Sequence, residues 1–162
     1  MLCSSAAAQS GPLYPGPLYV SDDAPSPIVA ADMNGDGIKD LVVGNANNTF
    51  SIFLGTATGT FGAPSTFAAG GGRGARGGRL QLRRHPDVAI AHALLATTIS
   101  VALSDGLGGY GAPTDYAVGA GAGHLAAGDF DGDGKQDLVV TNSNAASISI
   151  LLGNGTGDSP PR

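Results

Sequence analysis

The chain repeats itself with a period of 47 to 50 residues, and this repetition limits the folds available to it. The first repeat contains apolar runs at 41–45 and 51–55, and the last repeat has matching runs at 138–142 and 149–153. Short β-branched runs between Gly, Asn and Pro indicate strands. With about four such runs in each repeat, the sequence predicts an all-β fold built from four-stranded antiparallel blades of the β-propeller type.

A middle copy of the repeat lies between these two. It has runs at 87–90 and 100–103, and its aromatic-Gly-Ala-Pro tetrapeptide at 110–113 also occurs at 61–64. The 162 residues hold about three repeats, whereas a closed propeller of such blades needs roughly twice this length. We therefore expect an incomplete propeller, with repeat units at about 27–70, 71–119 and 120–157.

Two nine-residue segments, 32–40 and 129–137, place side-chain oxygens at relative positions one, three, five and nine. At this spacing alternate residues of a tight loop surround a calcium ion, with a glycine turn at position six and a backbone carbonyl at position seven. Solvated Asx-Gly turns are the alternative interpretation. The predicted metal ligands are Asp32, Asn34, Asp36, Ile38 (carbonyl) and Asp40 in the first loop, and Asp129, Asp131, Asp133, Lys135 (carbonyl) and Asp137 in the second.

These loops are not EF-hands, which need a glutamate at position twelve and a helix on each side. All 13 acidic residues are aspartate, and Val43 and Val140 stand at position twelve. A β-branched run follows each loop, so the loops are predicted to connect strands. We expect two calcium ions to bind, more tightly at the second loop because it has four carboxylates where the first has three and Asn34.

The Asp-x-Asn/Asp-x-Asp-Gly-x-x-Asp-Leu loops and the Phe/Tyr-Gly-Ala-Pro tetrapeptides resemble the FG-GAP or VCBS repeat family of integrin α-subunit propellers and many secreted bacterial proteins. The resemblance extends from about Tyr14 to Gly157. It implies a calcium-stabilised, non-enzymatic module for adhesion or scaffolding, within a larger secreted or cell-surface protein that binds a protein or glycan ligand. The alternative is an accessory carbohydrate-binding module of a secreted hydrolase or lectin.

The composition contains few signals for other functions. No apolar run approaches the roughly 20 residues of a membrane helix. The single cysteine, Cys3, excludes an internal disulfide, and the three histidines have no nucleophile pattern near them, so we expect no catalytic residue. Export agrees with calcium loops, because weak sites fill at the millimolar calcium found outside cells.

The middle repeat loses its loop. Residues 79–86 stand where the ligands should be, and five of the eight basic residues lie within 73–84. Reading this segment one base later is compatible with a third Asp-x-Asn-x-Asp-Gly loop, so we hypothesise compensating frameshifts across 71–86. The competing interpretation is an arginine-glycine segment that binds nucleic acid or an acidic partner, but it lacks the interleaved aromatic residues of RNA-binding segments. As written, the segment 72–86 is expected to be disordered or poorly packed, because 71–78 has almost no side chains to bury and the arginines avoid the core.

Both ends depart from the repeat. Residues 1–13 are predicted to be a disordered tail or a signal-peptide remnant, because Ala6-Ala7-Ala8 resembles the end of such a peptide. Residues 158–162 form a C-terminal tail where the pattern requires an outer strand. Open blade edges expose unpaired backbone groups, so self-association is expected.

Overall fold

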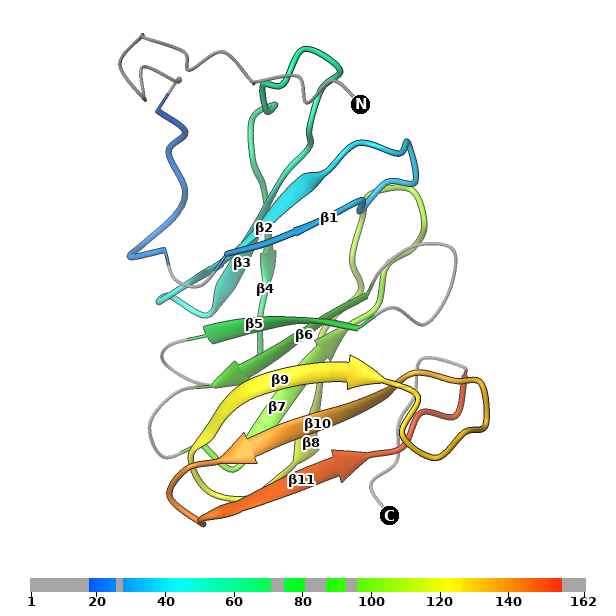
Figure 1. Ribbon diagram of the computed structural model, residues 1–162. Helices are drawn as coiled ribbons and strands as arrows, with labels where there is room; N and C mark the ends of the chain where they lie inside the picture. Colours follow the sequence, from blue (N-terminus) through cyan, green and yellow to red (C-terminus); the bar gives the residue numbers. More distant parts are fainter. Residues whose placement is uncertain (1–17, 26–27, 71–74, 81–86, 93–95, 156–162) are drawn as a thin grey trace, which may run out of the picture.

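The computed structural model describes residues 18–25, 28–70, 75–80, 87–92 and 96–155. These residues form eleven β-strands in three antiparallel sheets and contain no helix (Figure 1). No described segment is therefore a helix able to cross a membrane. The all-β prediction and the antiparallel blades are confirmed.

The first sheet follows the first repeat in the order β1-β2-β3-β4. Its strands are β1 (Ile28–Ala31), β2 (Asp40–Asn45), β3 (Thr49–Phe53) and β4 (Ser65–Ala68). The second sheet has the same order, with β5 (Ala75–Leu80), β6 (Asp87–His92), β7 (Thr98–Ala102) and β8 (Thr114–Ala117).

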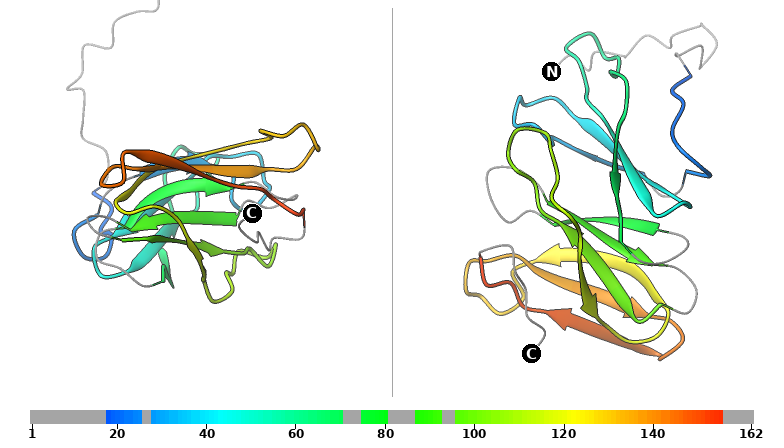
Figure 2. Two further views of the ribbon diagram at one scale, coloured as in Figure 1. Left: turned by 90° about the horizontal axis from the view of Figure 1, so that it is seen from below. Right: turned by 180° about the vertical axis from the view of Figure 1, so that it is seen from behind.

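The third sheet has three strands among the described residues, in the order β11-β10-β9. They are β9 (Ala122–Gly128), β10 (Asp137–Asn142) and β11 (Ser147–Leu151). The sheets are stacked face to face, and the first strands of neighbouring sheets, β1, β5 and β9, are in contact (Figures 1 and 2). This is the arrangement of consecutive, incomplete propeller blades.

The hydrophobic core lies between the sheets rather than within any one of them. Phe50 and Ile52 of β3 pack with Val88 and Ile90 of β6. The ring centroids of Phe50, Phe67 and Tyr110 lie 5.2 to 5.4 Å from one another. A second cluster joins β7 to the third sheet, where Leu138, Val140 and Leu151 face Ile99 and Val101. Each sheet therefore depends on the next one to cover its apolar face.

The middle sheet corrects the expectation of disorder over 72–86 in part. Residues 75–80 form β5 and pair with β6 along its full length, while residues 71–74 and 81–86 lie outside the described residues. Backbone hydrogen bonds hold this strand, and they do not need large side chains. All six residues of β6 are buried, in agreement with the apolar run Val88 to Ala91 between Asp87 and His92.

A buried polar side chain ends the second strand of every sheet. Asn45, His92 and Asn142 each bond a serine of the third strand, at 3.0, 2.6 and 2.9 Å respectively. The serines Ser51, Ser100 and Ser149 are spaced evenly along the chain. Because a buried polar group needs a partner, this pair is a structural signature of each blade.

Candidate metal centre

The two predicted metal loops have the same backbone path. The first joins β1 to β2 and the second joins β9 to β10. Gly35 and Gly37 have φ of 81° and 85°, and Gly132 and Gly134 have φ of 80° and 81°. Side chains disfavour this left-handed region, so glycine at positions four and six is what allows the loop to turn twice.

The aspartate at position one is held identically in both loops. Asp32 accepts hydrogen bonds from the backbone N–H groups of Gly35 at 2.7 Å and Gly37 at 2.9 Å. Asp129 accepts from Gly132 and Gly134 at the same two distances. Desolvation acts to raise the pKa of Asp32, but these backbone donors outweigh it and leave the pKa below its ordinary value.

The aspartate at position nine is buried and connects the loop to the end of the third strand. Asp40 accepts from the N–H groups of Met33 and Gly55, both at 2.7 Å. Asp137 accepts from Phe130 at 2.9 Å and Gly153 at 2.7 Å. A carboxylate has about four acceptor sites, so both aspartates retain lone pairs for a cation.

The chain passes very close to itself at this connection. A Cβ added to Gly55 would lie 2.3 Å from the Lys39 carbonyl oxygen, and one added to Gly153 would lie 2.0 Å from that of Gln136. No side chain can be accommodated at these distances. Glycine is therefore required where the third strand ends against an intact loop.

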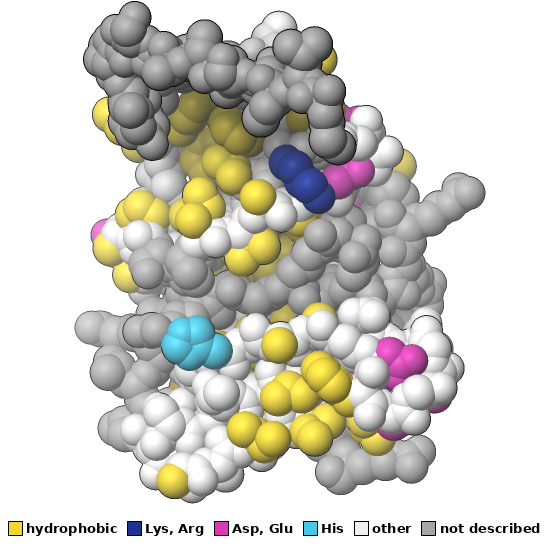
Figure 3. All heavy atoms as spheres, in the orientation of Figure 1, with side chains coloured by type: hydrophobic (Ala, Val, Ile, Leu, Met, Phe, Trp, Pro, Cys, Tyr) yellow, Lys and Arg dark blue, Asp and Glu magenta, His cyan; other side chains and the backbone are white. Residues whose placement is uncertain are grey.

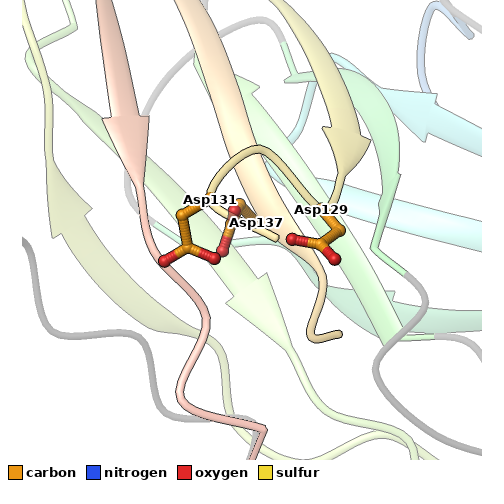
Figure 4. Close-up of side chains that lie close together, drawn as sticks. All are labelled: Asp129, Asp131 and Asp137. Atoms are coloured by element: carbon orange, nitrogen blue, oxygen red, sulfur yellow. The ribbon is translucent and has the colours of Figure 1, made fainter. Parts of the chain in front are cut away.

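The second loop brings three carboxylates together. Asp129, Asp131 and Asp137 each place an oxygen within 4.8 Å of the others (Figure 4). Within the described residues no other three His, Cys, Asp or Glu side chains meet this criterion. Three carboxylate oxygens gathered at one loop are the type of ligand that a hard divalent cation such as calcium takes.

Asp133 and Lys135, the other predicted ligand residues of the second loop, contact each other through the Asp133 carboxylate and the Lys135 ammonium and N–H groups. Asp133 forms an ion pair with the Lys135 ammonium group and is not part of the carboxylate cluster. The backbone N–H of Lys135 also donates to Asp133. The Lys135 side-chain hydrogen bond is the main cause of the lowered pKa of Asp133, and the same contact raises the pKa of Lys135.

The first loop is arranged differently at positions three and five. Its position-three residue is Asn34, whose amide donates to Asp36 at 2.9 Å and accepts from the Asp36 N–H at 3.0 Å. The Ile38 N–H donates to the other Asp36 oxygen. Asp32, Asp36 and Asp40 are not brought within the spacing of the second cluster, so the first loop presents fewer converging charges.

Asp87 shows what sequence reasoning missed. It lies at the ninth position of the middle repeat, is buried, and accepts from the Ser104 N–H at 2.8 Å. The bond is equivalent to those of Asp40 and Asp137, although residues 81–86, where the loop would be, lie outside the described residues. Position nine therefore has a structural role of its own. Its retention in a repeat without other ligands was the available signal.

His92, Ser100 and Asp115 form a hydrogen-bonded chain that runs from the buried His92 and Ser100 to the exposed Asp115, with the residue types of a hydrolase triad but a different order. The Ser100 hydroxyl donates to Asp115 and contacts His92 Nε2 at 2.6 Å. In a catalytic triad the histidine lies between the acid and an accessible serine. Here the serine is central and fully buried. The three residues therefore form a structural polar network, which extends the Asn–Ser pairs of the outer sheets.

Comparison with known families finds a match in each of two parts of the chain. Residues 22–80 match the FG-GAP-like repeat, and residues 121–158 match the FG-GAP repeat. The matched segments contain both loops and leave residues 81–120 uncovered. No curated protein and no solved structure matches the chain.

Proposed function

Since this chain belongs to the FG-GAP repeat family, we propose that it is a calcium-binding, non-enzymatic repeat module of a secreted or cell-surface protein. FG-GAP repeats are integrin α-like modules, typically structural or binding units of extracellular or surface proteins. The observation that carries the proposal is the carboxylate cluster of Asp129, Asp131 and Asp137. Three carboxylates at this spacing repel one another unless a cation neutralises them.

The second loop would hold its ion through Asp129, Asp131 and Asp137. Oxygen donors without nitrogen or sulfur are the set that hard divalent cations prefer. Asp129 is already oriented by two glycine N–H groups, and Asp137 by Phe130 and Gly153. Because the backbone positions these two carboxylates, the loop would bind with little further ordering.

An ion in this loop would join parts of the blade that are separate in sequence. Asp137 connects the loop to the end of β11 through Gly153, so a cation bound to Asp137 would be linked to three strands. The first loop has the corresponding connection through Asp40 and Gly55. We infer that calcium stabilises blade geometry for adhesion or scaffolding and carries out no chemistry.

Calorimetric titration of calcium into the chelator-stripped chain tests this proposal. We expect two sites, the tighter at the second loop, and weaker binding of magnesium. Asp129→Asn should abolish the tighter site and leave the other, and Asp32→Asn should do the reverse. Both aspartates lie in loops between strands, so the substitutions should leave the sheets intact. Circular dichroism can verify this for each variant. A folded wild-type chain that gives neither binding heat nor a calcium-dependent thermal shift would refute the proposal.

A further inference from the structure

Residues 18–23 contact the first sheet as the chain leaving β8 contacts the third sheet. The Ala46 N–H donates to the Asp23 carbonyl at 2.9 Å, and the Ser143 N–H donates to the Gly121 carbonyl at the same distance. In the first sheet, the Ser21 hydroxyl donates to the buried Asn45. In the third sheet, the Gly119 N–H donates to Ser149, which in turn accepts from the buried Asn142. Residues 18–20 therefore occupy the position of the end of a fourth strand whose own sheet is not present.

The sequence supports this assignment. Pro15, Pro64 and Pro113 are evenly spaced, and Pro64 and Pro113 directly precede β4 and β8. In this register Leu18 corresponds to Phe67 of β4 and Tyr116 of β8. Phe67 and Tyr116 are covered by neighbouring sheets, but Leu18 is 91 % exposed and Val20 is 75 % exposed. The apolar side chains of this segment lack the sheet that would cover them.

The opposite end of the molecule has a sheet that lacks a fourth strand among the described residues. β11 pairs with β10 and, within the described residues, has no strand on its other side. Ile148 and Ile150 are 61 % and 48 % exposed, and Figure 3 shows hydrophobic side chains on the visible face of this lower sheet. Their counterparts in β3 and β7 are all buried: Phe50, Ile52, Ile99 and Val101.

We propose that a second copy of the chain completes the third sheet. Residues 18–20 of one copy would add to β11 of the other as an antiparallel fourth strand, as β4 adds to β3 and β8 to β7. Leu18 would then pair with Ile148, as Phe67 pairs with Phe50 and Tyr116 with Ile99. The first sheet of the added copy would cover Ile148 and Ile150.

The added strand is assigned to a second copy because, within one copy, the two complementary surfaces lie at opposite ends of the stack and do not meet (Figures 1 and 2). The contact joins different surfaces of the two copies, so it is head-to-tail and can close into a ring. Two copies of three blades give six, within the four to eight blades of known propellers. We therefore expect a closed dimer.

Light scattering coupled to size exclusion tests the proposal on the intact chain. The wild type should have twice the 15.9 kDa mass of one chain, and Leu18→Asp and Ile148→Asp should each yield monomers. Both side chains are exposed, so the substitutions should leave the fold intact, which circular dichroism can verify. Leu107→Asp is the matched control, because Leu107 is 93 % exposed but lies between β7 and β8, and it should leave the dimer intact.

Mixing the two monomeric variants tests the orientation of the contact. A Leu18→Asp copy keeps its β11 edge, and an Ile148→Asp copy keeps its N-terminal strand, so the mixture should form a dimer with one of each. A wild type that is monomeric at every concentration would overturn the proposal and assign the fourth strand to a longer chain. Persistence of the Leu18→Asp dimer would also overturn it, because that result indicates an edge-to-edge contact.

Discussion

The outer sheets and the middle sheet each have an aspartate at position nine of the repeat, but its surroundings differ. Asp40 and Asp137 close complete loops and bond Gly55 and Gly153, whereas Asp87 makes the equivalent bond to Ser104 in a repeat that has lost the other ligands. The middle sheet still has four strands in the same order. The comparison shows that the aspartate at position nine bonds the end of the third strand whether or not the repeat keeps the other predicted ligands.

The largest expected effect is the loss of position nine. Asp137→Ala leaves the N–H groups of Phe130 and Gly153 without their acceptor, at about 1–3 kcal/mol each. We expect urea unfolding to show destabilisation in chelator as well as in calcium. Asp87→Ala should also be destabilised, and calcium should not alter its deficit. If Asp137→Ala were destabilised only in calcium, position nine would have no structural role.

Calcium removal should have the next largest effect. At a hundredfold excess over Kd, an ion stabilises the folded form by about 2.7 kcal/mol per site, because it binds the folded chain alone. The urea midpoint should therefore fall when chelator replaces calcium. Asp129→Ala should lose the part of this midpoint shift that calcium binding at the second loop provides. Asp105→Ala, which alters an aspartate of a turn in the middle sheet, should retain the full shift.

His92 should make the middle sheet sensitive to pH where the outer sheets are not. Burial lowers the pKa of His92, and the Asp115 charge opposes this only partly. The unfolded chain therefore takes up the proton first as the pH falls, so stability is full above the ordinary histidine pKa of about 6.5 and declines below it. Chemical unfolding between about pH 7.5 and 5.5 should show this decline.

His92→Asn provides the internal comparison, because asparagine is the natural residue at the matching positions, Asn45 and Asn142. The variant should lose the part of the decline that belongs to His92. His124→Asn, at an exposed site on β9, should retain it. An unchanged pH profile in His92→Asn would show that the protonation of this residue is not linked to folding.

The smallest effect concerns the difference between the two loops. Lys135 pairs with Asp133 in the second loop, whereas Ile38 occupies that position in the first. Exposed ion pairs contribute little, so Lys135→Gln should raise the calcium affinity of the second loop only by a small factor. Calorimetry should show no change at the first loop. Weaker calcium binding in the variant would mean that the lysine supports the site.

The repeat period predicted most of the fold because apolar runs that recur at a fixed spacing mark the strands of each blade. The strands around Val42, Ile52 and Val139 form where the β-branched runs predict them. The position of β5 was not predicted, because its Gly and Arg residues give no alternating apolar pattern. Backbone pairing with the apolar β6 determines it instead.

The candidate site was predictable in composition but not in its internal contacts. Spacing alone identified the convergence of Asp129, Asp131 and Asp137. It could not show that Asp133 pairs with Lys135, or that Asn34 and Asp36 bond each other, because these depend on side-chain orientation. The ligand sets predicted for the two loops stay predictions until binding is measured.

The close approach at Gly55 and Gly153 bears on how the middle repeat diverged. The corresponding residue is Ser104, whose side chain could not be accommodated against a loop of the same shape as the outer two. Ser104 lies beyond the segment 71–86 that a reading-frame error would alter. A corrected frame across 71–86 would therefore leave this close approach absent from the middle repeat. In other chains built from this repeat, glycine at this position would mark the blades that still have an intact loop.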